Sequence, residues 1–332
     1  MKKIKTICTI GPRSRSPEII LGLIKTGADA LRINLSHTPP AQAKKMIVQI
    51  RSLSKRIPII IDTQGKETRI GASRQKAVLL KKNAEIVVAH TLSPQARKSD
   101  AVLFISRADV LLSLKTGHTI FVDDNNIQLQ VLRSEPDTLV LKCMVIQGGP
   151  IGAAKNIRLE NEFEPKTALT IADKSVIAFA KKFPPCEVAL SYVADASDVQ
   201  EARKFIGPRI PITSKIETLK SLKNLMAIVK ASDALSIDRN DLGTNVGAEN
   251  IPRIQKNVIA LCRRLQKPVF VATHFLETMV SNNKPTRGEI NDIYNTALDG
   301  ASGIILSSET AVGKDPVHIL KTLRTILSLT RA

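Results

Sequence analysis

The sequence has few aromatic side chains, few cysteines and no long apolar run. Aromatic residues make up 3% of the chain and tryptophan is absent, which leaves few flat surfaces on which single-stranded bases could stack. The cysteines at positions 8, 143, 186 and 262 form no CxxC pair, which favours reduced, buried thiols over a disulfide framework or a zinc site. No apolar run approaches the roughly 18 residues that cross a bilayer.

Several common functional motifs are also absent. There is no Walker loop, no GxGxxG fingerprint and no GxSxG elbow, so the usual nucleotide cradles and the α/β-hydrolase nucleophile are excluded. The first five residues lack the apolar segment of a signal peptide. We therefore expect a cytoplasmic protein that does not associate with membranes.

Positive charge is in excess, with a formal net charge of +19. Such a surface should attract polyanions. Nucleic acid is one candidate partner, but the basic residues are scattered and the chain has few aromatic residues to accompany them. We therefore disfavour nucleic acid, expect phosphorylated small molecules as partners, and leave the formation of a homo-oligomer open.

Apolar strand-like runs alternate with amphipathic helical stretches along most of the chain. We expect strands at residues 4–10, 28–35 and 57–63, and, after an interruption, at 187–193, 211–216, 234–238, 268–273 and 303–307. Helices are expected at residues 16–25, 40–53, 168–181, 197–205, 219–230, 250–265, 289–299 and 317–329. This alternation is typical of a parallel sheet.

The interruption is a β-rich block with its own pattern. Short strands are expected at residues 85–89, 102–105, 119–122, 127–132 and 138–145, with a hairpin turn at residues 123–126. We interpret residues 71–152 as an inserted lid domain, and residues 1–70 with 153–332 as the main domain. Three strands before the block and five after it predict a closed TIM (β/α)8 barrel, with an open doubly wound sheet as the alternative.

Polar residues follow most of the expected barrel strands, where the catalytic groups of such barrels lie. They are Asn34, Ser36, Asp62, Thr63, Ser191, Lys215, Glu217, Asp241, Thr273, Ser307 and Ser308. Lys215 and Glu217 lie two residues apart and should project from the same side of their strand. The alternative for this pair is an ion pair at the surface.

Two carboxylates from neighbouring strands, Glu217 and Asp241, could bind magnesium, which commonly takes one or two carboxylates together with substrate oxygens and water. Lys215 beside such a metal could offset the charge of a transferring phosphoryl group. Arg32 and Arg69 are forked donors suited to phosphate. Taken singly, Arg69 could be a surface residue and Asp241 a helix cap, but together the residues favour a metal-assisted phosphate site.

A series of short motifs runs in order along the chain. They lie at residues 8–16, 32–37, 62–65, 214–217, 239–243, 272–279, 285–289 and 308–311, and include Ser214-Lys215-Ile216-Glu217 and Arg239-x-Asp241-Leu242-Gly243. In this order they resemble the pyruvate kinase family, in which the inserted block corresponds to the lid domain. The resemblance covers residues 4 to about 325.

The resemblance implies a glycolytic kinase that transfers the phosphoryl group of phosphoenolpyruvate to ADP, giving pyruvate and ATP. It further implies a site made of several groups. Glu217 and Asp241 would bind Mg²⁺ or Mn²⁺, and Lys215 would stabilise the phosphoryl and enolate charge. Thr273 would assist protonation of the enolate, and Asn240 would contact the substrate. Phosphates would be held by Arg32, Arg69 and Lys155, and K⁺ would be bound by Asn34, Ser36, Asp62 and Thr63, with Glu67 supporting the need for K⁺.

The chain departs from the family's pattern at several positions. Asn240 stands where the family has glycine, Asp238 where it has a small residue, and Ala194 where it has arginine; Gln64 and Lys66 also differ. We expect the extra carboxylate of Asp238 to repel an anionic substrate unless an arginine pairs with it. The family's C-terminal regulatory domain has no counterpart in the sequence, so we expect regulation through it to be absent.

Three functions are consistent with these observations. The first is a pyruvate kinase or a close phosphotransferase relative. The second is an enzyme that keeps a magnesium–enolate site but carries out aldol or decarboxylation chemistry without ADP. The third is a catalytically silent relative that binds anions. The departures at positions 194, 238 and 240 leave the choice among them open.

Overall fold

The protein consists of two compact units. The structure, a computed structural model, describes residues 3–66, 68, 70, 77–90, 102–105, 107–123, 125–152, 157–159 and 167–330. Contacts divide the chain into a first unit of residues 1–65 and 167–332 and a second unit of residues 66–166. The second unit thus extends about five residues before and about fourteen after the block expected from the sequence.

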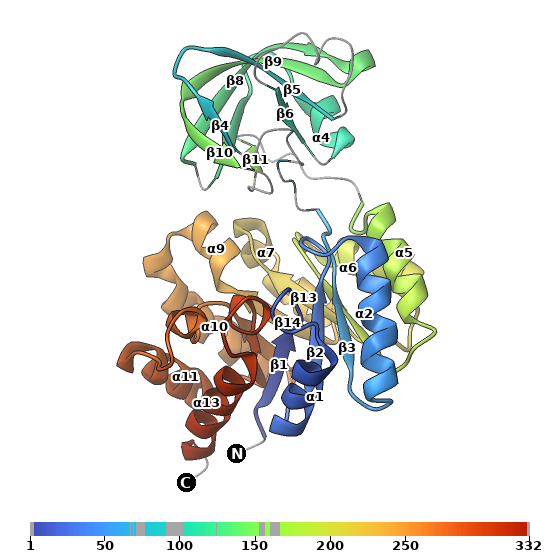
Figure 1. The fold of residues 1–332 in the computed structure, drawn as a ribbon. Helices are drawn as coiled ribbons and strands as arrows, with labels where there is room; N and C mark the ends of the chain where they lie inside the picture. The colour runs from blue at the N-terminus through green and yellow to red at the C-terminus, as the bar shows by residue number, and fades with distance from the viewer. Residues whose placement is uncertain are drawn as a thin grey trace. The chain divides into compact units, whose positions relative to one another are not determined.

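The first unit is a closed barrel of parallel strands (Figure 1). In order around the barrel the strands are β1 (Lys5–Thr9), β16 (Gly303–Leu306), β15 (Val269–Ala272), β14 (Ala234–Asp238), β13 (Ile212–Ile216), β12 (Cys186–Leu190), β3 (Ile59–Asp62) and β2 (Ala30–Asn34). The predicted barrel is confirmed, and the alternative of an open sheet is wrong because β1 pairs with both β2 and β16.

Helices surround the barrel. They are α1 (Pro17–Thr26), α2 (Pro40–Leu53), α5 (Ile171–Ala180), α6 (Ala196–Ile206), α7 (Leu219–Lys223), α8 (Leu225–Ala231), α9 (Arg239–Val246), α10 (Ile251–Arg264), α11 (Arg287–Asp299), α12 (Ser308–Ala311) and α13 (Pro316–Leu329), with the short 3₁₀ turns η2 (Ala248–Asn250) and η3 (Glu277–Val280). Local signals set several boundaries: Thr170 and Thr286 form capping boxes, and Gly27 and Gly300 end helices with positive φ.

Two apolar cores hold the barrel unit together. One lies between the strands and the helices, and includes Leu31, Ile59 and Leu320. The other fills the barrel interior with Ile7, Ala30, Ile60, Ala189, Ala234, Phe270, Ala272 and Ile305. A cavity of only about 10 Å³ lies between these apolar side chains and the polar residues near the carboxyl ends of the strands. The barrel interior is therefore a packed core that supports a site at its mouth.

The second unit is built from two small sheets. One has the order β11 (Ile157–Leu159), β7 (Thr119–Val122), β8 (Ile127–Glu135), β9 (Val140–Gln147), β5 (Glu85–Ala89), β6 (Val102–Phe104); the other pairs β10 (Gly149–Gly152) with β4 (Ala77–Leu80). A helix, α4 (Ala108–Ser113), and the 3₁₀ turn η1 (Pro136–Thr138) complete it. The predicted hairpin is confirmed: Asp123 and Asn125 have positive φ between antiparallel β7 and β8.

Some elements differ from those expected. The helix predicted at residues 219–230 is two helices, α7 and α8, interrupted at Asn224. Helix α9, which begins directly after β14, was not predicted, because its first turn is polar and carries the motif residues. Within the described part of the chain, no helix is long and apolar enough to span a membrane. The four cysteines are free, as expected, and burial raises the pKa of Cys262 to about 11.

Candidate functional site

The polar groups that follow the barrel strands converge at the carboxyl ends of β3, β12, β13 and β14. β13 carries Lys215 near its end, and Glu217 follows the strand directly. Only 6% of Lys215 and none of Glu217 is exposed. The alternative of a surface ion pair is therefore wrong, and the two charges belong to the barrel interior.

Lys215 is surrounded by acceptors. Its Nζ lies 2.9 Å from Glu217 Oε1, 2.9 Å from Asp238 Oδ2, 3.3 Å from Asp62 Oδ1 and 3.1 Å from Ser191 Oγ. These acceptors come from four neighbouring strand ends, because β3, β12, β13 and β14 are consecutive around the barrel. One ammonium thus connects the ends of four of the eight barrel strands.

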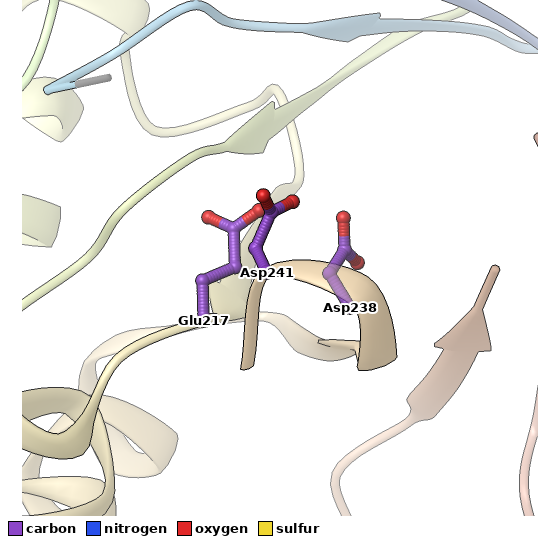
Figure 2. Close-up of side chains that lie close together, drawn as sticks. All are labelled: Glu217, Asp238 and Asp241. Carbon is purple, nitrogen blue, oxygen red and sulfur yellow. The ribbon is translucent and has the colours of Figure 1, made fainter. Parts of the chain in front are cut away.

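Three carboxylates of the site lie close together (Figure 2). Each of Glu217, Asp238 and Asp241 offers an oxygen within 4.8 Å of the other two. Tyr192, which follows β12, donates to two of them: its backbone N–H to Glu217 Oε2 at 2.6 Å and its hydroxyl to Asp241 Oδ1 at 3.2 Å. The cluster is therefore oriented by a neighbouring strand end as well as by Lys215.

The protonation equilibria of the site follow from burial and pairing. Burial raises the pKa of Glu217 well above its usual value; Lys215 opposes this rise, and Asp238 and Asp241 add to it. Burial alone would lower the pKa of Lys215, but Asp238, Asp62 and Glu217 together hold it well above its ordinary value. The ammonium of Lys215 is therefore a permanent charge of the site.

Arg32 and Asp62 form a second buried pair on β2 and β3. Arg32 Nε lies 2.5 Å from Asp62 Oδ2, and Nη1 donates to Thr9 and Ser307. Burial alone would raise the pKa of Asp62, but the cations of Arg32 and Lys215 hold it below its ordinary value. Among the described residues, Nη2 of Arg32 has no hydrogen-bond partner, so it is the guanidinium nitrogen left for a ligand.

Thr273, directly after β15, has an unusual backbone. Its φ is +74° and that of His274 is +57°, left-handed values that non-glycine residues seldom adopt. Thr273 Oγ1 donates to Ala272 O and accepts from the backbone N–H of Asn240, while Arg239 donates to Thr273 O. The loop is thus tied to the start of α9. His274 is exposed.

Asn240 lies in the first turn of α9 and does not have a positive φ. This position therefore does not require glycine on conformational grounds. Its side chain is exposed, whereas that of Asp238, two residues earlier, is 3% exposed. The carboxylate of Asp238 pairs with a lysine, Lys215, rather than with an arginine.

The residues expected to bind potassium lie on adjacent strands. Asn34 and Asp62 are register partners at the ends of β2 and β3. Asn34 Oδ1 accepts from the backbone N–H of Ser36 at 2.9 Å, and Thr63 Oγ1 accepts from that of Ser191 at 3.1 Å. The register thus places Asn34 beside Asp62, although both carboxylate oxygens of Asp62 already have cationic partners.

Three residues named in the sequence analysis, Glu67, Arg69 and Lys155, lie outside the described residues. Conversely, the structure adds three groups to the site whose roles the sequence did not reveal: Ser191 and Asp238 as partners of Lys215, and Tyr192 as a donor to the carboxylates. For Ser191, the only signal in the sequence was that a polar residue follows the expected strand. Nothing in the sequence pointed to Tyr192, because its main contact uses the backbone.

The carboxylate cluster fits a divalent cation. Hard oxygen ligands are what Mg²⁺ and Mn²⁺ prefer. Within the described residues, Glu217 Oε1 is a fully buried oxygen without a hydrogen bond, even though it lies 2.9 Å from the ammonium of Lys215; the ion-pair distance is short but the hydrogen-bond geometry is poor. A cation among the three carboxylates would satisfy that oxygen.

Comparison with known proteins agrees with this geometry. The family model described as pyruvate kinase, barrel domain, matches residues 1–320. The chain is 34% identical to the pyruvate kinase of Thermotoga maritima, covering 97% of this chain and 70% of that one. It is 33% identical to those of Mycobacterium intracellulare and Staphylococcus saprophyticus, of which it covers 69% and 56%. The chain belongs to the pyruvate kinase family.

Proposed function

We propose that the protein transfers the phosphoryl group of phosphoenolpyruvate to ADP, giving pyruvate and ATP. The observation that carries this proposal is the position of Lys215, a buried permanent cation beside a carboxylate cluster at the mouth of the barrel. Membership of the pyruvate kinase family supports the reaction. The small-molecule partners are phosphoenolpyruvate or pyruvate and ADP or ATP, and the reaction would take place in the cytoplasm.

Glu217 and Asp241 would hold Mg²⁺ or Mn²⁺. When bound, the cation polarises the phosphoryl and enolate oxygens of the substrate. Lys215 would place its ammonium against the same oxygens and stabilise the negative charge that develops as the phosphorus–oxygen bond of the enol breaks. The buried position strengthens this effect because few water molecules screen it.

The enolate left after transfer must gain a proton at carbon to become pyruvate. Thr273, whose φ of +74° turns it toward α9, would lie near this carbon and direct a water molecule to it. The exposed amide of Asn240 would donate to the substrate carboxylate. Arg32, through Nη2, would contact a phosphate oxygen, and Arg69 and Lys155 would do the same.

Monovalent cation binding completes the proposal. Asn34, Ser36, Asp62 and Thr63 would bind K⁺ at the ends of β2 and β3, which would offset phosphate charge beside Arg32. The register pairing of Asn34 with Asp62 supports this site.

A coupled assay with phosphoenolpyruvate, ADP, Mg²⁺ and K⁺ tests the proposal. ADP-dependent formation of pyruvate with equal formation of ATP is the expected result. Pyruvate formation without ADP would instead indicate the magnesium–enolate enzyme, which the added negative charge of Asp238 favours. No turnover, with the protein folded and binding Mn²⁺, would indicate a silent anion-binding relative.

A further inference from the structure

Four acceptors surround the ammonium of Lys215, which has three N–H groups. Its Nζ donates a hydrogen bond to Ser191 Oγ, and oxygens of Glu217, Asp238 and Asp62 lie at ion-pair distances of 2.9, 2.9 and 3.3 Å. Lys215 is also nearly fully buried. A substrate oxygen that approaches this cation therefore competes with these carboxylates for it.

Asp238 is the carboxylate beside Lys215 that the proposed function assigns to neither the divalent cation nor K⁺. Asp62 is also held by Arg32 and Ser191, and Glu217 also by Tyr192. Asp238 also accepts at Oδ1 from Ser236, on the same face of β14, at 2.8 Å. Its second oxygen, Oδ2, faces Lys215 at 2.9 Å.

The charges of the site do not balance without a bound cation. The buried or half-buried anions are Asp62, Glu217, Asp238 and Asp241, and the cations are Arg32 and Lys215. Whatever cations are bound, an uncharged residue at position 238 would make this set one unit more positive, and charge differences of this kind act strongly where water is excluded.

We propose that Asp238 determines substrate specificity by limiting the negative charge of the ligand that the site accepts at Lys215. Compared with a site that is uncharged at residue 238, the site would bind a trianion that carries a fully ionised phosphate more weakly relative to a dianion, such as an enolate carboxylate or a dicarboxylate. This inference rests on the proposed function, because it concerns the same site. It differs from the proposed function because it predicts the ratio of the affinities for two ligands of different charge, which can be measured whether or not phosphoryl transfer occurs.

Binding of two ligands of different charge tests this inference. Titration calorimetry of the full chain at saturating Mn²⁺, without ADP and at a pH where phosphate is fully ionised, gives the affinities for oxalate, a dianion, and for phosphoenolpyruvate, a trianion. Asp238→Asn removes the charge and keeps the shape. Asp238→Asn weakens the competition for Lys215 and so raises the affinity for both ligands. This gain cancels in the ratio of the two affinities, which therefore reports the effect of charge.

We expect Asp238→Asn to raise the affinity for phosphoenolpyruvate about tenfold more than the affinity for oxalate. Asp238→Glu, which keeps the charge, should retain a ratio near that of the unchanged protein. Asp299→Asn is the matched control: it also removes one negative charge, but it lies at the end of α11, at the opposite end of the barrel, where it pairs with Lys256. It should leave the ratio unchanged.

Equal changes of the two affinities in Asp238→Asn, or a larger gain for oxalate, would overturn the inference. If Asp238→Asn does not fold, Asp238→Ala gives the same comparison with a smaller side chain. The outcome separates the two proposals. A shifted ratio of affinities without any pyruvate formation would support the inference and refute the proposed function. Full kinase turnover with an unshifted ratio would support the proposed function and refute the inference.

Discussion

At the scale of single residues, the site depends on Lys215 more than on any other group described. Its ammonium joins carboxylates from three strand ends, and burial keeps water from replacing them. Removing it would leave several buried anions facing one another, so its loss should affect both metal binding and the charge that develops during phosphoryl transfer.

Lys215→Met tests this dependence. The substitution keeps most of the side-chain length and removes the charge, and the loss of one preorganised electrostatic contact typically lowers turnover by about 10²–10³-fold. Steady-state kinetics with circular dichroism as a check on folding measures the effect. Lys230→Met, on the exposed end of α8, is the control and should do little. A folded Lys215→Met enzyme with nearly full activity would refute the assigned role.

Glu217 should make metal binding depend on pH. Its raised pKa means that the carboxyl keeps its proton at pH values where an ordinary glutamate has lost it, and a divalent cation needs the ionised form. The affinity for Mn²⁺ should therefore fall as the pH is lowered through that raised pKa, with protons released on binding.

Calorimetry of Mn²⁺ binding in buffers of different ionisation enthalpy measures both effects. Glu217→Gln should bind the metal more weakly, recover part of its activity at high metal concentration, and lose this proton release. Proton release that is the same in Glu217→Gln as in the unchanged protein would show that another group titrates.

Turnover should require a monovalent cation that the oxygens of Asn34, Ser36, Asp62 and Thr63 can bind. K⁺ is small enough to lie among these donors at the ends of β2 and β3, whereas tetramethylammonium cannot coordinate to oxygen. We expect high activity in potassium salts and low activity in tetramethylammonium salts of equal ionic strength. Equal rates in the two salts would contradict the assignment.

The sequence predicted much of the site but few of its internal contacts. Alternation along the strand placed Lys215 and Glu217 on one face, and both lie in the site as expected. The pairing of Asp238 with Lys215 was not predicted, because it depends on how closely β13 and β14 bring their ends together once the barrel closes. The role of Tyr192 was not predicted either, since a backbone donor leaves no trace in residue type.

At the scale of elements, a tight turn after β3 fixes the position of Ser191. Gly65 has a φ of +59°, and a Cβ at this position would lie 2.6 Å from Ser191 O. The buried carboxylate of Asp173, at the start of α5, accepts from the backbone N–H groups of Gln64 and Gly65. This turn therefore sets the distance between β3 and β12, and through Ser191 it reaches Lys215.

Gly65→Ala should destabilise the barrel and slow turnover. Left-handed backbone in a residue with a Cβ costs about 1–3 kcal/mol, and the close approach to Ser191 O adds to this. Thermal unfolding and kinetics measure the two effects. Gly288→Ala is the control, because it lies exposed near the start of α11 with space for a Cβ and should be neutral or slightly stabilising. A Gly65→Ala protein as stable and active as the unchanged one would refute this account.

Elements with a clear apolar period were predicted closely, and those without one were missed. The bounds of α2 and β14 agree with the prediction to the residue. β10 (Gly149–Gly152) was missed because its glycines and proline are typical of turns, and it forms only by pairing with β4. The break at Asn224 likewise depends on tertiary contacts, since Asn224 donates to Ala194 O.

At the scale of the whole molecule, the barrel does not need the second unit for its strand order. β3 and β12, which flank the insertion, pair directly with each other. The barrel segments on either side of the insertion also contact one another, because the backbone N–H groups of Gln64 and Gly65 donate to Asp173. The second unit is thus connected to the barrel where a short linker could replace it.

Replacing residues 66–166 by a short glycine–serine linker should leave the barrel folded and able to bind Mn²⁺, but should abolish transfer to ADP. The reason is that the metal cluster lies wholly in the barrel unit, whereas we expect the lid to close over the nucleotide and exclude water. Circular dichroism, Mn²⁺ titration and the coupled assay measure the three properties. Unchanged turnover would contradict a role for the lid.

The pairing of β1 with β16 also has a consequence for how the chain is made. The partner of Lys5 is Gly303, so the first strand leaves the ribosome long before its neighbour exists. At roughly 5–20 residues per second, this delay lasts on the order of 15–60 s. The strands of the inserted unit end at Leu159 and have their partners much earlier. Folding of the insertion can therefore begin early in translation, whereas closure of the barrel must wait until β16 has been synthesised.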